Sequence, residues 1–220
     1  MGIISVEQAD RLFWLGRYSE RVYTTLRLYS NSFDEMIDGI ADSYRDFCRS
    51  IDIPDVYGSK KAFEEKYPFD ETNPDSIMSN LNRAYDNAIE LRDELGSEVI
   101  SYIQLAIYAM NKARFSKAPL IEMQKVMDNI LAFWGIADDS IDSEKARDMI
   151  KVGKRIERID LYGRLRISRR ELQREIDRLT PRIDRSGLVY NKEKLLLVKE
   201  LIAAPEIDYY RVVREVEAVV

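Results

Sequence analysis

The sequence predicts an all-α protein, a single multi-helix bundle, on three observations. The chain has 9 glycines and 6 prolines among 220 residues, which is too few for a fold of many short strands and turns. Residues 5–50 and 143–180 contain no proline, so each segment can form one long helix. Apolar residues recur in these segments at three- and four-residue spacing, which is typical of an amphipathic helix.

The first long helix is predicted over residues 5–50. Ser5 and Gln8 have the spacing of a capping box, in which the two side chains satisfy free amides at a helix start. Pro54 and Gly58 lie in the segment that follows the helix and ends it. The apolar stripe of this helix consists of Leu12, Leu15, Val22, Leu26, Tyr29 and Phe33.

The remaining helices are delimited by capping and breaking residues. Asn73 and Pro74 suit a helix start. Gly96 and Gly135 suit helix ends, and Pro181 is expected to stop the second long helix. No Gly- or Ser-rich linker divides the chain, so residues 1–220 are predicted to form one helical domain. The predicted helices span residues 5–50, 60–67, 73–95, 97–115, 120–134, 143–180, 191–203 and 206–220, with an acidic loop at 138–142.

Composition excludes several kinds of function. The chain has no histidine and one cysteine, Cys48, which excludes Ser-His-Asp and Cys-His catalysis, His-ligated zinc and an internal disulfide. We therefore predict no cofactor. A net charge of −5 argues against nucleic acid as a partner. Residues 1–14 do not resemble a signal peptide, and the longest apolar run, residues 99–110, is too short to span a bilayer. We expect a cytoplasmic protein that binds no membrane.

One short pattern occurs in both long helices. Residues 15–28 read LGRYSERVYTTLRL, and residues 152–165 read VGKRIERIDLYGRL. Aligned without a gap, both contain Gly, a basic residue, Glu-Arg and a further Arg at the same offsets. Chance helix composition would rarely produce this match. The matching pairs are Gly16/Gly153, Arg17/Lys154, Glu20/Glu157, Arg21/Arg158 and Arg27/Arg164.

Each motif glutamate is predicted to be buried. Glu20 and Glu157 lie on helix faces that are otherwise mainly apolar or glycine, about one turn from a Gly that lets another backbone approach. A buried carboxylate needs a cation and hydrogen bonds. The arginine after each glutamate lies about 100° around the helix, so it reaches the other helix more readily than its own neighbour. We therefore expect a polar core in which each glutamate meets arginines of the opposite segment. The candidates are Arg21, Arg27, Arg158 and Arg164.

Such a cluster has two possible roles. It can be a salt-bridge network that fixes the register of the helices. It can also bind an anionic small molecule or a peptide end, because arginine holds carboxylate and phosphate through paired hydrogen bonds. Sequence reasoning leaves both roles open. The candidate binding residues are Arg17, Glu20, Arg21, Arg27, Lys154, Glu157, Arg158 and Arg164.

At these residues the sequence resembles the alpha-E domain family, α-helical proteins of bacteria and archaea with a Glu-Arg motif. The likeness is strongest at residues 9–22 (ADRLFWLGRYSERV) and 151–160 (KVGKRIERID). Residues 73–99, which begin Asn-Pro-Asp-Ser-Ile, resemble the middle segment of the family, and Trp134-Gly135 also fits.

The resemblance implies a role beside ATP-grasp-type peptide or amide ligases and transglutaminase-like proteins, with which such domains are encoded or fused. It assigns no reaction to the domain itself. We therefore expect a helical accessory or substrate-presenting protein, with an ATP-grasp-type ligase or a transglutaminase-like protein as partner. The oligomeric state is not predicted.

One enzymatic alternative uses the same cluster. Glu20 or Glu157 would act as general base, and an arginine would hold the carboxylate or oxyanion during amide or peptide chemistry.

A second enzymatic alternative depends on three acidic residues. Asp138, Asp139 and Asp142 have the DDxxD spacing with which class I isoprenoid synthases hold magnesium and diphosphate, and Asp34 and Asp38 are a looser partner motif. Magnesium would be a cofactor only in this case. Acidic residues before a helix also act as caps and favour its dipole.

A ladder of arginines follows the second motif. Its spacing of four, with acidic residues between, is typical of a solvated helix face with ion pairs, and binding of phosphates or an acidic partner is the alternative. The ladder consists of Arg166, Arg170, Arg174, Arg178 and Arg182.

Overall fold

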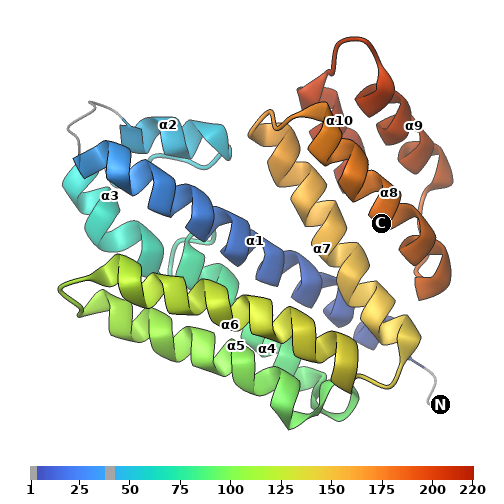
Figure 1. Ribbon diagram of the computed structural model, residues 1–220, viewed down its shortest axis with the longest axis horizontal. Coiled ribbons are helices and arrows are strands. Elements are labelled where there is room, and N and C mark those ends of the chain that lie inside the picture. Colours follow the sequence, from blue (N-terminus) through green and yellow to red (C-terminus); the bar gives the residue numbers. More distant parts are fainter. Residues whose placement is uncertain (1–3, 38–42) are drawn as a thin grey trace.

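The computed structural model describes residues 4–37 and 43–220 of the chain (Figure 1). This part consists of ten α-helices and one turn of 3-10 helix, without a strand, so the predicted all-α fold is confirmed. None of its helices combines the length and the apolar character needed to cross a bilayer. The elements are α1 (Val6–Ile37), α2 (Ser43–Ser50), α3 (Lys60–Lys66), η1 (Tyr67–Phe69), α4 (Ile77–Glu90), α5 (Arg92–Arg114), α6 (Pro119–Ser140), α7 (Glu144–Arg164), α8 (Arg169–Ser186), α9 (Lys192–Ala203) and α10 (Tyr209–Glu217).

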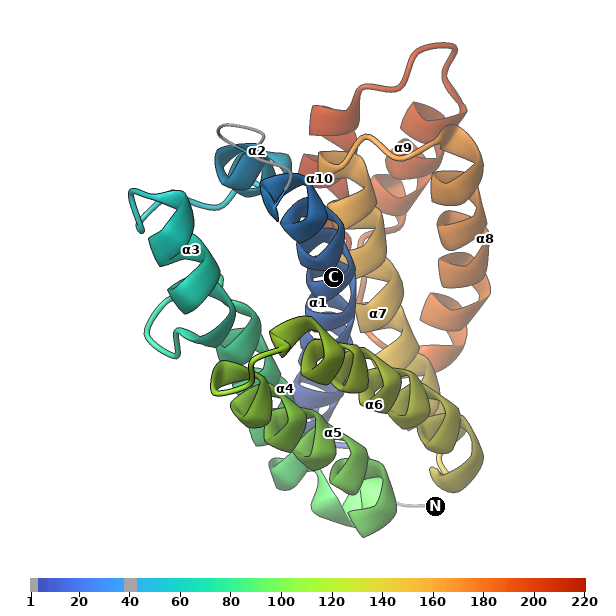
Figure 2. The same ribbon diagram turned by 60° about the vertical axis from the view of Figure 1, so that its left-hand side comes forward.

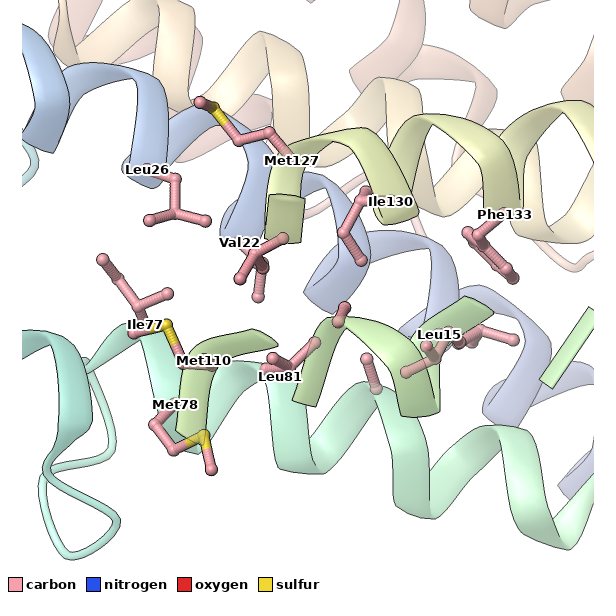
Figure 3. Packing of buried hydrophobic residues seen from close by; sticks show 14 of the residues in the cluster. Leu15, Val22, Leu26, Ile77, Met78, Leu81, Met110, Met127, Ile130 and Phe133 are labelled. Atoms are coloured by element: carbon pink, nitrogen blue, oxygen red, sulfur yellow. The ribbon is translucent and has the colours of Figure 1, made fainter. Parts of the chain in front are cut away.

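Helices α1 and α7 lie side by side in the middle of the bundle (Figures 1 and 2). Helices α4 and α6 pack on the flank of α1, with α5 against both, whereas α8 and α10 pack on the flank of α7. Two apolar clusters follow this division. Figure 3 shows part of the larger one, where Leu15, Val22 and Leu26 of α1 meet side chains such as Ile130 of α6. The smaller cluster joins α7 to α8, α9 and α10.

Two glycines set the close approach of α1 and α7. A Cβ atom added to Gly16 would lie 2.0 Å from the Ile150 carbonyl oxygen, and one added to Gly153 would lie 2.0 Å from that of Phe13. No side chain larger than hydrogen fits at such a separation. The matching glycines of the two motifs are therefore the points at which the two backbones touch.

The predicted single helix over residues 5–50 is wrong. The rings of Tyr29 in α1 and Phe47 in α2 are only 6.0 Å apart, whereas 18 residues of continuous helix would separate them by about 27 Å. Helix α2 therefore packs back on α1. The predicted start is confirmed, because the Ser5 hydroxyl accepts from the Gln8 amide and the Gln8 side chain accepts from the Ser5 amide.

The second long helix, predicted over residues 143–180, is also two helices. Helix α7 ends at Arg164, and Arg166 adopts a left-handed φ of 50°, which no sequence signal for a helix end would suggest at an arginine. Pro181 lies inside α8, where the Thr180 hydroxyl bonds back to the Ile176 carbonyl. The helix ends instead at Gly187, whose φ is 79°.

The other predicted boundaries have mixed outcomes. Helix α6 continues past Gly135 to Ser140, because Gly135 keeps a helical conformation, so residues 138–140 are not a loop. Helix α4 is capped by Ser76 rather than begun at Asn73. Gly96 does mark the predicted break, with a φ of 75°. Helices α3 and α9 agree with prediction, and α10 is shorter at both ends than residues 206–220.

Candidate functional site

The two motif glutamates are buried at the α1–α7 crossing and pair across it. Glu20 is 0% exposed and Glu157 is 1% exposed. Arg158 of α7 donates to the two oxygens of Glu20 at 2.6 and 2.7 Å. From α1, Arg17 donates to one oxygen of Glu157 at 2.7 Å, and Arg21 donates to the other. The predicted cross-helix pairing is therefore confirmed for Arg21 and Arg158.

This pairing follows from the packing of the helices. The glycine contacts bring the backbones together about one turn before each glutamate, so the carboxylates lie inside the interface and out of reach of water. A buried carboxylate without a partner costs several kcal/mol. The Thr24 hydroxyl adds a hydrogen bond of 2.9 Å to Glu20. Each glutamate oxygen thus accepts at least one hydrogen bond, and each glutamate is held by charged donors.

Two further buried carboxylates extend the cluster. Asp160 accepts from Arg164 at 3.0 and 3.1 Å and lies 3.6 Å from Arg21, and its burial raises the pKa of the carboxyl. Glu175 of α8 is fully buried and belongs to the same ionic network. Sequence reasoning missed both residues, because Asp160 is not one of the positions that match between the two copies and Glu175 lies beyond the second copy. The cations nearest Glu175 are Arg155, Arg158, Arg174 and Arg178.

A cavity of about 300 Å³ adjoins the cluster at Glu157. Arg17, Arg21 and Glu157 line it. Each of the two guanidiniums donates a hydrogen bond to Glu157 and also borders the cavity. Trp14 and Tyr18 form an aromatic wall, stacked with ring centres 5.3 Å apart. The cavity therefore combines two arginines with an apolar face.

The segment that follows residue 73 provides the opposite wall and a third arginine, Arg83 of α4. Arg83 donates to the Pro74 carbonyl at 3.2 Å, and its guanidinium lies 5.7 Å from the centre of the Tyr18 ring. The Asn73 side chain shapes this turn by accepting from the Asp75 amide. Sequence reasoning missed Arg83, although it lies in the middle segment that resembles the family. The structure thus brings that segment to the Glu-Arg core.

The remaining predicted site residues lie elsewhere. Lys154, the counterpart of Arg17, places its Nζ 3.8 Å from the centre of the Trp134 ring. Burial lowers the pKa of this amine to about 7, against the opposing effect of the nearby Glu20 carboxylate. Arg27 is exposed and stacks on its own helix, 5.8 Å from the Tyr23 ring centre.

Arg164 does not meet a motif glutamate, which corrects the expectation for this position. It pairs with Asp160 one turn earlier on α7, and with Asp52 and Glu217 at 3.0 and 3.4 Å. The reason is helix geometry: Asp160 lies four residues before Arg164, on the same face.

The three acidic residues of the DDxxD pattern are divided between a helix and the segment that follows it. Asp138 lies in α6 and pairs with Lys151, whereas Asp142 lies beyond the end of that helix. Asp139 is exposed. Within the described ranges, no three acidic, cysteine or histidine side chains are arranged to hold a metal ion. The partner motif cannot be placed, because Asp38 and the side chain of Asp34 lie outside the described residues.

The chain belongs to the Alpha-E family. The family model, which describes a predicted alpha-helical domain with a conserved ER motif, matches residues 7–191. Within this range Glu-Arg occurs at residues 20–21 and 157–158, the two pairs that meet at the crossing. No curated protein and no solved structure matches the chain.

Proposed function

We propose that the protein is a helical accessory protein that binds the carboxylate end of a peptide or small molecule and presents it to an ATP-grasp-type peptide or amide ligase. A transglutaminase-like protein is the second partner that the family resemblance implies. The proposal places the protein in the cytoplasm, where such a ligase has access to ATP. It depends most on one observation: Arg17, Arg21 and Arg83 line one cavity beside a buried glutamate.

The arginines around the cavity provide donors suited to an anionic ligand. Arg17 and Arg21 both bond to Glu157, Arg21 also lies 3.6 Å from Asp160, and Arg83 bonds to a neutral carbonyl. Three guanidiniums therefore line the cavity together with three carboxylates, those of Glu157, Asp75 and Glu217, and Glu157 is already committed to two of the arginines. Arginine suits this role because its planar group binds a carboxylate through two parallel hydrogen bonds.

The aromatic wall fits a ligand with an apolar or peptide portion beside its charge. Trp14 and Tyr18 offer a flat surface next to the arginines, and such surfaces bind well at low entropic cost. A ligase that forms peptide or amide bonds uses a carboxylate substrate. A protein that holds such a carboxylate can deliver it to the ligase, which links the cavity to the expected partner.

The geometry favours binding over catalysis by this chain. A general base needs a free oxygen, but both oxygens of Glu157 and of Glu20 accept hydrogen bonds from arginine. The residues that line the cavity include no cysteine, serine or lysine as a nucleophile. We therefore rank the accessory role above amide chemistry by the Arg-Glu pocket and above the isoprenoid alternative.

Titration calorimetry with two matched peptides tests the proposal. The probe is N-acetyl-Gly-Ser-Gly-Ser with a free carboxylate, and the control is the same peptide with a carboxamide end. We expect the free acid to bind about tenfold more tightly or better, since charge-assisted hydrogen bonds contribute about 1.5–3 kcal/mol. Arg83→Gln should remove most of this preference. Arg170→Gln, an exposed change of equal charge on α8, should retain it.

Equal affinity for the acid and the amide would overturn the carboxylate proposal. The partner is tested separately by measuring ATP consumption of the co-purifying ligase with wild-type protein and with Arg83→Gln. A co-purifying partner that is unrelated to ligases would contradict the proposed association with a ligase, but it would not contradict the carboxylate site.

A further inference from the structure

A second cavity, of about 430 Å³, lies where α2, α7 and α10 meet. Four arginines line it, against two acidic residues, so its wall is predominantly basic. Two tyrosines at the start of α10 complete it, and one of them, Tyr210, is 79% exposed. Its charged lining consists of Arg49, Asp52, Arg164, Arg166, Arg214 and Glu217.

Arg166 is the arginine of this cavity that is available to bind a ligand. Arg49 pairs with Asp46, and Arg214 pairs with Glu215, each on its own helix. Arg166 is exposed and has no ion-pair partner within residues 4–37 and 43–220. A free guanidinium at the rim of a basic cavity can bind an anion without first breaking a salt bridge.

Two left-handed helix ends also meet at this cavity. Among the described residues, Asp52 and Arg166 are the two non-glycine positions with a positive φ, at 56° and 50°. Both line the cavity, from segments far apart in the sequence. Each follows a helix end: the Ile53 amide donates to the Cys48 carbonyl and the Ile167 amide donates to the Tyr162 carbonyl, which is the hydrogen-bond pattern of a helix C-terminus. The left-handed turn at Arg166 follows the end of α7, and Arg164 and Arg166 both line the cavity.

Glu217 connects the second cavity to the first. Its side chain lines both cavities, and its carboxylate lies 3.4 Å from Arg164. Beneath the surface, Arg21 at the first cavity and Arg164 at the second both contact Asp160. The two cavities are therefore adjacent. They share one lining residue, Glu217, whose side chain is half-exposed.

We propose that the two cavities form one groove for an acidic peptide, which places its terminal carboxylate beside Arg83 and an acidic side chain beside Arg164 and Arg166. This rests on the proposed function, because the first contact is the carboxylate site described above. The Glu217 carboxylate already pairs with Arg164, so the second subsite binds the same group that an acidic side chain of the peptide would provide. A peptide that spans both cavities would displace this carboxylate from Arg164. Two adjoining subsites favour an extended chain over a single phosphate ion.

Calorimetry with a peptide series tests the second subsite. The reference is N-acetyl-Gly-Ser-Gly-Ser-Gly-Ser as the free acid, and in each probe a single Glu replaces one residue before the terminal position. At fixed ionic strength, we expect one Glu position to bind about tenfold more tightly than the reference, because two linked contacts reinforce each other. Arg166→Gln should abolish this gain and leave the affinity for the reference peptide unchanged. Glu217→Gln should increase the gain several-fold, because a competing carboxylate is removed.

The outcomes separate this inference from the proposed function. If every Glu position binds like the reference, or if Arg166→Gln keeps the gain, the second subsite is wrong while the carboxylate site stands. If Arg83→Gln has no effect and Arg166→Gln abolishes all binding, the carboxylate site is wrong and the groove is reduced to its second cavity. If inorganic phosphate displaces the peptide more strongly than free glutamate does, the commitment to an acidic peptide is overturned. Arg170→Gln is the matched charge control in every arm.

Discussion

The two copies of the Gly-base-x-x-Glu-Arg motif have different surroundings. In the α1 copy, the base is Arg17, which holds Glu157 and lines the first cavity. In the α7 copy, the base is Lys154, which lies against the Trp134 ring. Glu20 is enclosed by Arg158 and Thr24.

The comparison separates what the motif does for the fold from what it can do for a ligand. Both copies supply a glycine contact and a buried glutamate, which hold α1 and α7 together. The α1 copy in addition faces a cavity with an arginine and an aromatic wall. The glycine and the glutamate, which both copies share, therefore form the crossing. The basic position differs: Arg17 of the α1 copy borders a cavity, the open side, and Lys154 of the α7 copy packs on Trp134, the enclosed side.

The largest expected effect is on the crossing itself. Gly16→Val and Gly153→Val should each destabilise the protein by more than about 4 kcal/mol or prevent folding, because a side chain would meet a carbonyl oxygen of the opposite backbone. Urea denaturation followed by circular dichroism measures the change. Gly135→Ala is the control: it lies inside α6 with no atom within 4 Å of the added Cβ, and it should raise stability by about 0.5–1 kcal/mol. Near-equal effects of all three changes would contradict the backbone contact.

The second prediction compares the two glutamates. Glu157→Ala and Glu20→Ala should each lower the free energy of unfolding by about 3–5 kcal/mol, because each leaves arginine without its buried partner. Acetate should then restore stability to Glu157→Ala alone, since Glu157 lines a cavity that admits a small anion, whereas Glu20 is enclosed by Arg158 and Thr24. Thermal melts in sodium acetate and in sodium chloride of equal ionic strength measure the difference.

The opposite pattern would contradict the assignment of an open and an enclosed side. Rescue of Glu20→Ala alone would place the accessible side at α7. If an alanine variant does not fold, the shorter Glu→Asp change leaves a smaller gap and permits the same comparison.

The helices were predictable where local signals decide them, and not where tertiary contacts do. The capping box at Ser5 and the cap at Asn191 depend on neighbouring residues, and both helices begin as predicted. Gly39 lies between α1 and α2 and is a signal for a helix end that the prediction did not use, whereas the left-handed position after α7 is an arginine. Packing of Tyr29 against Phe47 holds α2 back on α1, and the left-handed conformation of Arg166 follows the end of α7. Pro181 shows the converse, because it is a helix breaker by type and yet lies inside α8, which continues to Ser186.

The candidate site was predictable in its core and not at its margins. Two equal patterns with buried acids implied cross-pairing, and hydrogen bonds from Arg21 and Arg158 provide it. Asp160 and Arg83 were missed, since Asp160 has no matching acid in the first copy of the repeat and Arg83 comes from α4. Which arginine faces a cavity depends on the packing of a third segment, and a spacing pattern carries no information about that.

The smallest expected effect concerns the base at which the two copies differ. Burial lowers the pKa of Lys154 to about 7 in the folded protein, against 10.5 as its ordinary value, so between these values the unfolded chain binds the extra proton and stability rises with pH. From pH 6 to pH 9, the wild type should therefore gain about 2–3 kcal/mol relative to Lys154→Met, at about 1.4 kcal/mol for each pKa unit. The chain has no histidine, so few other groups titrate in this range, and those that do cancel in the comparison. Arg17→Met is the matched control, because guanidinium groups do not titrate in this range, and its stability difference from wild type should stay constant with pH. Denaturation curves at both pH values measure these differences in the free energy of unfolding. If the difference between wild type and Lys154→Met were also constant with pH, the amine would be solvated. The α7 side of the crossing would then be as open as the α1 side.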